Sequence, residues 1–173
     1  MVKAKTGMEK NALNQLEQLP EIREIHVITG QYDLLICLDT KETDLDPRRK
    51  VLDLVVERID KMGGIARVDT IIPVDSQGHR PPTFERPVRK AFVFIQSKPG
   101  KEKDLMHKLL EIPEVIQVHL LLGRADLLAE LEVEKSFIQP SPRHIADIVE
   151  EKVERLKEVL NTTTYVPIES TIR

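Results

Sequence analysis

The sequence has few of the residues that several functions require. Its one cysteine, Cys37, excludes an intramolecular disulfide and a zinc site built from several cysteines. Tryptophan is absent, and there are four phenylalanines and two tyrosines, so aromatic platforms for stacking bases are not expected. The net charge of −3 lacks the basic excess of a broad nucleic-acid surface. We therefore expect no direct nucleic-acid contact.

Long apolar segments and catalytic motifs are missing too. No apolar run approaches a membrane span, and the first ten residues, MVKAKTGMEK, lack a signal-peptide core. A glycine-rich phosphate loop, a Ser/His/Asp spacing and a His-Glu-x-x-His motif are also absent. Hydrophobic residues make up 40% of the chain, which is enough for a core. These features predict a cytoplasmic, non-catalytic protein with no cofactor and no membrane contact.

The chain consists of two similar halves. Residues 5–38 and 98–131 align without a gap, and thirteen of the 34 positions are identical, where chance would give about two. The similarity continues after a one-residue insertion in the second half. The sequence therefore predicts one domain at 1–74, a proline-rich linker at 75–89 and a second domain at 90–173.

Each half shows the same order of patterns. A strand and a proline-bounded helix come first, followed by two strands that a glycine hairpin joins. A second helix begins at Asp46-Pro47 or at Ser141-Pro142, where a capping oxygen precedes a proline. A last strand is expected at 68–74 and at 162–168. The order predicts an α+β fold of two ferredoxin-like βαββαβ units.

Period-two alternation predicts two different faces on each sheet. Ile25 and Val27 share the apolar face, whereas Glu24 and His26 share the mixed one. Because the helices cover one face of such a sheet, we expect the mixed faces to pack together as an intramolecular dimeric α/β barrel.

The first strand of the first half is short. Aligning the halves leaves only Met1–Ala4 for a strand that is internal in this topology, so backbone groups of its neighbours risk lacking partners. Either a short strand at Val2–Lys5 suffices, or the true start lies upstream.

Both halves resemble the effector-binding domain of the Lrp/AsnC transcription regulators. The matching stretches are KTGMEKNALNQLEQLPEIREIHVITGQYDLLICL and FVFIQSKPGKEKDLMHKLLEIPEVIQVHLLLGRADLLAEL. The markers are a glycine after Lys-x, a proline-bounded helix, a histidine and a T-G-x-Y-D-L-L hairpin, which is intact in the first half and reads L-G-R-A-D-L-L in the second. The resemblance implies a RAM-type, ACT-like domain that forms oligomers and binds amino acids or related molecules near the second hairpin.

Members of this family usually carry an N-terminal helix-turn-helix that contacts DNA. The first unit here begins at Met1, so the resemblance implies a sensing or assembly module without its own DNA-binding domain. Such a module would act as a homo-oligomer or in a hetero-assembly with a DNA-binding Lrp/AsnC-like relative.

The resemblance also implies ligand contacts around the hairpins. The candidate residues are Thr29, Gly30, Tyr32, Asp33 and Thr70 in the first half, and Gly123 and Asp126 in the second. Ala125 replaces the tyrosine in the second half, so whether that site functions is left open. Each candidate also has a structural interpretation: the glycines allow a tight hairpin, the carboxylates accept bonds from turn amides, and threonine favours strands.

Two histidines and the cysteine are the remaining candidates for chemistry. His26 and His119 occupy equivalent positions on the mixed faces. They are either hydrogen-bonded interface residues or ligands of a metal, with Asp33, Glu130 or Asp126 supplying oxygen. They also support the alternative of an α/β-barrel enzyme or a haem-binding protein. Cys37 is expected to be a buried small apolar residue.

Overall fold

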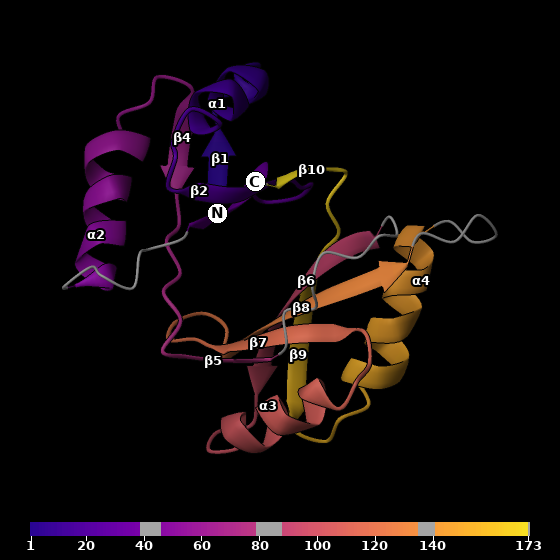
Figure 1. Ribbon diagram of the computed structural model, residues 1–173. Helices are drawn as coiled ribbons and strands as arrows, with labels where there is room; N and C mark the ends of the chain where they lie inside the picture. Colours follow the sequence, from indigo (N-terminus) through magenta and orange to yellow (C-terminus); the bar gives the residue numbers. More distant parts are fainter. Residues whose placement is uncertain (39–45, 79–87, 135–140, 173) are drawn as a thin grey trace. The chain divides into compact units, whose positions relative to one another are not determined.

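The computed structural model describes residues 1–38, 46–78, 88–134 and 141–172. They form two compact units, each with a five-stranded antiparallel sheet (Figure 1). Unit 1 comprises Met1–Ile71 with Pro167–Arg173, and unit 2 comprises Ile72–Val166. The predicted α+β fold is confirmed.

Unit 1 contains the strand order β10-β2-β3-β1-β4. Its apolar core lies between the sheet and the helices, and includes Ile25 from the face predicted to be apolar. Its elements in chain order are β1 (Val2–Ala4), α1 (Glu9–Leu16), β2 (Ile22–Val27), β3 (Leu34–Leu38), α2 (Pro47–Leu54), the π-helical turn η1 (Val55–Ile59), β4 (Ile65–Val68) and β10 (Glu169–Ile172).

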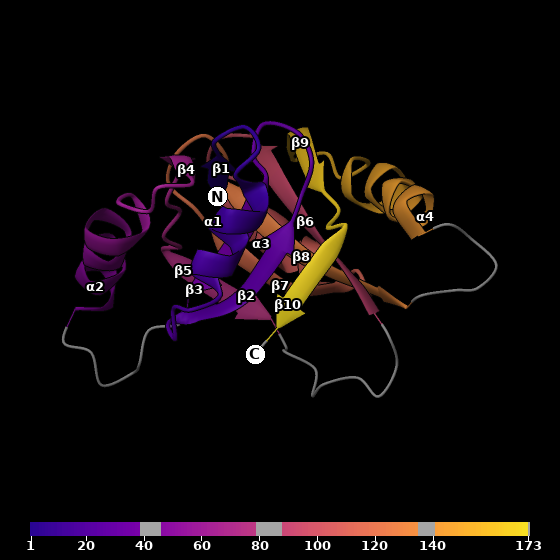
Figure 2. The same cartoon turned by 90° about the horizontal axis from the view of Figure 1, so that it is seen from above.

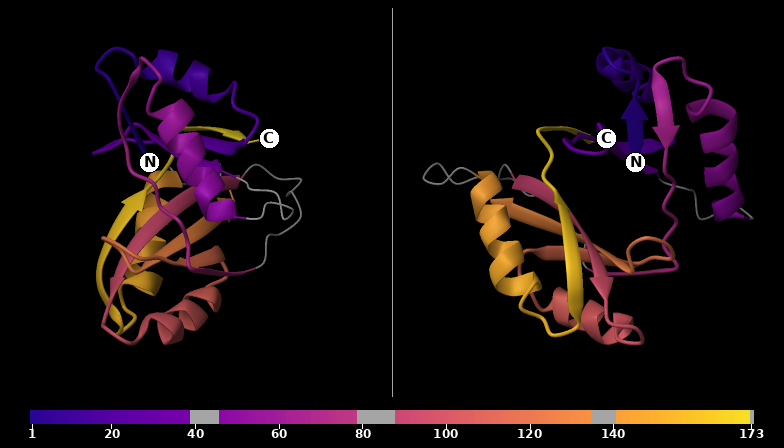
Figure 3. Two further views of the ribbon diagram at one scale, coloured as in Figure 1. Left: turned by 90° about the vertical axis from the view of Figure 1, so that its left-hand side faces the viewer. Right: turned by 180° about the vertical axis from the view of Figure 1, so that it is seen from behind.

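Unit 2 has the strand order β5-β7-β8-β6-β9. Ala91, Val93 and Ile95 alternate along β6 and lie in one core with residues of both helices, which share one sheet face (Figure 3). The elements are β5 (Asp75–Gly78), β6 (Val88–Ser97), α3 (Glu102–Leu110), β7 (Val115–Leu120), β8 (Leu127–Glu134), α4 (Ser141–Ile148), the π-helical turn η2 (Val149–Val153) and β9 (Val159–Tyr165).

The second helix of each half begins where the capping signal predicts. The Asp46 carboxylate accepts a 3.1 Å hydrogen bond from the Arg49 amide, and Pro47 starts α2. Helix α4 starts at Ser141. A π-helical turn follows directly in both halves. No helix within the described residues is long and apolar enough to cross a membrane.

Two strands, β10 and β5, pair with a strand from the other half of the sequence, and we call them the exchanged strands. Strand β10 pairs with β2, with Ser170 opposite His26 (Figure 2). Strand β5 pairs with β7, with Ser76 opposite His119. Asp75–Gly78 was predicted to belong to the linker, but it forms β5. Each sheet was predicted to have four strands, but it has five. Residues 79–87 of that linker lie outside the described residues.

The first strand of unit 1 is short. Strand β1 has three residues and pairs with both β3 and β4. Strand β4 ends at Val68, and the following Asp69 amide donates to the Met1 carbonyl (2.8 Å). The expected strand at 68–74 is therefore wrong. The much longer β6 lets β9 extend over seven residues.

We expect Gly78→Ala to detach β5 from β7. A Cβ at this position would lie 2.4 Å from the Ile116 carbonyl oxygen, and the φ angle of +141° is itself strained for alanine. The free energy of unfolding in urea should fall by about 1–3 kcal/mol.

Gly63→Ala is the matched control, because a Cβ there meets nothing within 4 Å. It should leave stability unchanged or slightly higher. Equal stability of the two variants would show that β5 does not pack on β7 as described.

Candidate functional site

The glycine hairpins form as the sequence predicts in both units. Gly30 and Gly123 have φ angles of +120° and +146°, which glycine adopts without strain. The Ile28 amide donates to the Asp33 carbonyl (2.9 Å), and the Leu121 amide donates to the Asp126 carbonyl (2.8 Å). Thr29 and Gly30 are exposed.

The aspartates that follow the hairpins hold a neighbouring strand. Asp33 accepts a 2.8 Å bond from the Ala4 amide, and Asp126 accepts a 2.7 Å bond from the Ser97 amide. The strand register shifts at Ala4 in one sheet and at Ser97 in the other, so the amides of these two residues need hydrogen-bond partners outside the strand pairing. The Asp33 carboxylate also pairs with the Lys3 ammonium at 2.7 Å. Both aspartates therefore have a structural role at these irregularities.

Tyr32 belongs to a polar group that the sequence analysis did not find. Its ring is buried, its hydroxyl donates to the Asp69 carboxylate, and the Arg67 guanidinium lies 5.8 Å from the ring centroid. Arg67 also donates to both Asp69 oxygens, at 2.9 and 2.8 Å, which raises the pKa of the guanidinium. Thr70, which follows Asp69, is exposed.

The second half lacks this polar group. Tyr32, Arg67 and Asp69 correspond to Ala125, Asn161 and Thr163. Arg67 lies in β4 and Asp69 directly follows this strand. Their spacing of two residues, which places both side chains on one face, was the sequence signal that could have indicated this polar group.

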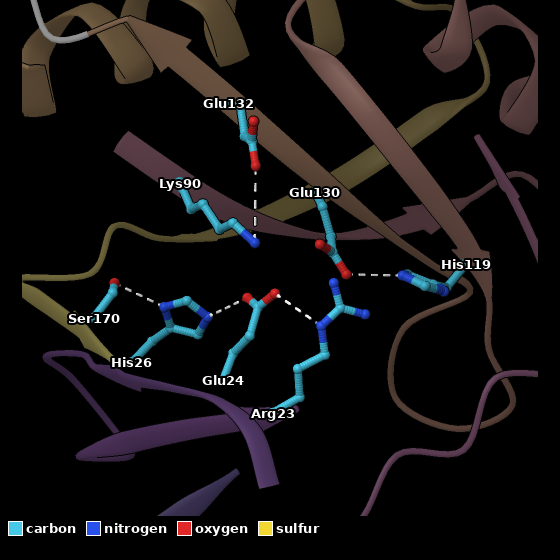
Figure 4. Close-up of polar contacts among 8 residues, drawn as sticks. All are labelled: Arg23, Glu24, His26, Lys90, His119, Glu130, Glu132 and Ser170. Carbon is cyan, nitrogen blue, oxygen red and sulfur yellow. Dashed lines mark hydrogen bonds and ion pairs between the residues drawn. The ribbon is translucent and has the colours of Figure 1, made fainter. Parts of the chain in front are cut away.

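His26 is fully buried between two polar partners. Its Nδ1 lies 2.8 Å from the Ser170 hydroxyl of β10, and its Nε2 lies 3.0 Å from the Glu24 carboxylate (Figure 4). Glu24 is 3% exposed, and its other oxygen lies 3.8 Å from Nε of Arg23. The exchanged strand thus supplies one of the two groups that fix the imidazole.

His119 has the same arrangement with one change. Its Nδ1 lies 2.8 Å from the Ser76 hydroxyl of β5, and its Nε2 lies 2.9 Å from the Glu130 carboxylate, which comes from β8 (Figure 4). At the position of Glu24 the second half has Gln117, whose Oε1 is buried without a hydrogen-bond partner among the described residues. The carboxylate that contacts the histidine therefore comes from the histidine's own strand in unit 1 and from the neighbouring strand in unit 2.

Cys37 stands where the second half has Glu130. It lies opposite Glu24 in the register of β2 and β3, just as Glu130 lies opposite Gln117 in β7 and β8. The ligand atoms of Glu24, His26 and Cys37 all lie within 4.8 Å of one another. Sequence reasoning treated Cys37 as an apolar residue, because only the register shows which residue it faces.

Three carboxylates were suggested as oxygen ligands for a histidine metal site, and only one of them contacts a histidine among the described residues. Asp33 and Asp126 bind strand amides, whereas Glu130 does contact His119.

Both units combine an antiparallel sheet with helices and have a glycine hairpin at equivalent positions. Residues 90–173 match the family model described as the Lrp/AsnC ligand binding domain. The second half is therefore similar to an Lrp/AsnC ligand-binding domain. Among curated proteins, none matches the sequence.

Several solved structures are similar to this chain. FFRP-DM1 is 28% identical over 46% of this chain and 99% of its own, with a TM-score of 0.41. AsnC of E. coli is 17% identical over 72% of each chain, with a TM-score of 0.44. The siroheme decarboxylase NirDL, in complex with an iron-uroporphyrin III analogue, is 11% identical over 98% of this chain and 70% of its own. Its TM-score of 0.65 shows likeness of fold alone.

We expect Asp126→Ala to destabilise the chain by about 1–3 kcal/mol, because the Ser97 amide would lose its charged acceptor. Ser97 is buried, so water cannot easily replace the carboxylate. Urea unfolding would measure the change.

Ser97→Ala is the control, since it removes only the longer 3.3 Å bond from the hydroxyl and keeps the amide bond. Its cost should be clearly smaller. If the two variants cost the same, the amide bond is not what Asp126 contributes.

Proposed function

We propose that the chain is a non-catalytic small-molecule sensing or assembly module whose ligand is an amino acid or a close analogue. The match of residues 90–173 to the Lrp/AsnC ligand-binding domain carries this proposal. Ligand binding acts by favouring one assembly over another, either of copies of this chain or with a DNA-binding Lrp/AsnC-like partner.

We place the ligand at the unit 1 hairpin, near Thr29 and Gly30. Arg67 favours unit 1, because its side chain is 47% exposed and Asp69 accepts from two of its five N–H donors, at 2.9 and 2.8 Å. The remaining donors suit a ligand carboxylate, which guanidinium groups bind well. Tyr32 and Asp69 hold the guanidinium in place.

Gly123 and Asp126 offer a second hairpin without these side chains. The replacement of Tyr32 and Arg67 by Ala125 and Asn161 favours a weaker site or none in unit 2. Thr70 remains a candidate contact beside Asp69.

A thermal-shift screen of the twenty amino acids tests this proposal. A ligand present at a hundred times its Kd should stabilise the chain by about 2.7 kcal/mol. Arg67→Gln should abolish the shift while the chain stays folded, because the residue is exposed. Asp33→Ala is a poor test, since it also removes the acceptor of the Ala4 amide.

Arg58→Gln is the matched control. Arg58 is 46% exposed and pairs with Glu21 at 2.8 Å in the same unit. Its loss should leave the ligand shift intact. No shift with any amino acid, or equal loss in both arginine variants, would contradict the proposed site.

The two histidines support a second candidate, a protein that binds an iron porphyrinoid. His26 and His119 are each fixed between a serine hydroxyl and a carboxylate, and a histidine can ligate haem iron or move a proton. The fold likeness to NirDL extends over nearly the whole chain.

Titration with iron-uroporphyrin III tests this candidate by absorption spectroscopy. Binding through a histidine should shift the Soret band, and His26→Ala or His119→Ala should remove the shift. A spectrum equal to that of the free porphyrin would exclude this candidate and leave the sensing proposal in place.

A further inference from the structure

The strongest unassigned chemistry lies on the mixed face of the unit 1 sheet. Glu24 and His26 follow each other on the same side of β2, and Cys37 lies directly opposite Glu24 on β3. Their ligand atoms all lie within 4.8 Å of one another. Carboxylate, imidazole and thiolate together are a set that borderline divalent metals such as Zn²⁺ prefer.

We propose that Glu24, His26 and Cys37 form a binding site for a zinc-like divalent metal ion. The proposal goes beyond the sensing function and does not depend on any amino-acid ligand. Three protein ligands leave a fourth tetrahedral position for water or an exchangeable ligand.

The distances fit an ion after small side-chain movements. Zn–N and Zn–O bonds of about 2.0–2.2 Å and a Zn–S bond of about 2.3 Å put neighbouring ligand atoms about 3.3–3.6 Å apart. Nε2 of His26 and Oε2 of Glu24 are already 3.0 Å apart. Because all three ligand atoms lie within 4.8 Å of one another, each has to move by about 1 Å or less to surround the ion.

A supporting contact for the histidine is already present. The Ser170 hydroxyl lies 2.8 Å from Nδ1 of His26, which leaves Nε2 as the nitrogen facing Glu24 (Figure 4). Metal-binding histidines commonly have such a partner on the other ring nitrogen, and its loss typically weakens binding by about 10–100-fold. Ser170 is thus a positioning residue rather than a ligand.

Unit 2 provides an internal comparison. It has the same register, the same irregularity and an equivalent histidine, His119, yet Gln117 and Glu130 stand where unit 1 has Glu24 and Cys37. The softest ligand, the thiolate, is missing there, and an amide replaces one carboxylate. We therefore expect one metal ion per chain, bound in unit 1.

Cobalt(II) titration of the chelator-treated full chain tests the site. Binding should produce visible d–d bands and a near-ultraviolet thiolate-to-cobalt charge-transfer band at one equivalent, and Zn²⁺ should displace the cobalt. Cys37→Ser should remove the charge-transfer band. Ser170→Ala should keep that band but weaken binding by about 10–100-fold.

Ser76→Ala and His119→Gln are the matched controls, because they change the equivalent positions of unit 2. Both should leave the titration unaltered. Gln117→Glu combined with Glu130→Cys should raise the stoichiometry to two ions per chain, a gain that misfolding cannot mimic.

Alkylation of the wild-type thiol gives an independent measurement on the unmutated chain. Zn²⁺ should slow modification of Cys37, which is partly buried. The proposal is overturned if wild-type protein shows no charge-transfer band, if the band survives Cys37→Ser, or if Ser76→Ala weakens binding as much as Ser170→Ala.

Discussion

The backbone hydrogen bonds between each sheet and the last strand of the other half are the constraint on which the structure depends. Without β10 and β5, strands β2 and β7 would be sheet edges with a row of unpaired amides and carbonyls. The exchanged strands pair with β2 and with β7. Next to β10, the Ile168 amide also donates to the Val27 carbonyl (2.8 Å). It also brings Ser170 to His26 and Ser76 to His119. One feature therefore completes the sheets and fixes both histidines.

The two halves keep this framework while their chemistry diverges. Strand registers, sheet irregularities, hairpins and π-helical turns are equivalent in both. The side chains on that framework differ: unit 1 has the Tyr32–Arg67–Asp69 group and a cysteine opposite Glu24, whereas unit 2 has neither. Unit 1 is consequently where we place both proposed sites.

Local sequence signals predicted much of the fold. Glycine at the hairpins, Asp46-Pro47 at a helix start and alternation around Ile25 each depend on a few neighbouring residues, and the structure has them all. The exchanged strands were missed because Asp75–Gly78 and Glu169–Ile172 are short and mostly polar, so they carry no strand pattern of their own. Glu24 and Cys37 were missed as candidate metal ligands because pairing them requires the register, including its irregularity between Ile22 and Glu24. Contacts between distant segments are what a single sequence predicts least.

Hydrogen exchange of the C-terminal segment is the most direct test of this account. The account predicts that the amides of Glu169–Ile172 that donate to β2 exchange much more slowly than those of an unstructured peptide, while the alternate amides of this edge strand exchange faster. Exchange of this segment at the rate of an unstructured peptide would contradict the strand exchange, and with it the placement of Ser170 against His26.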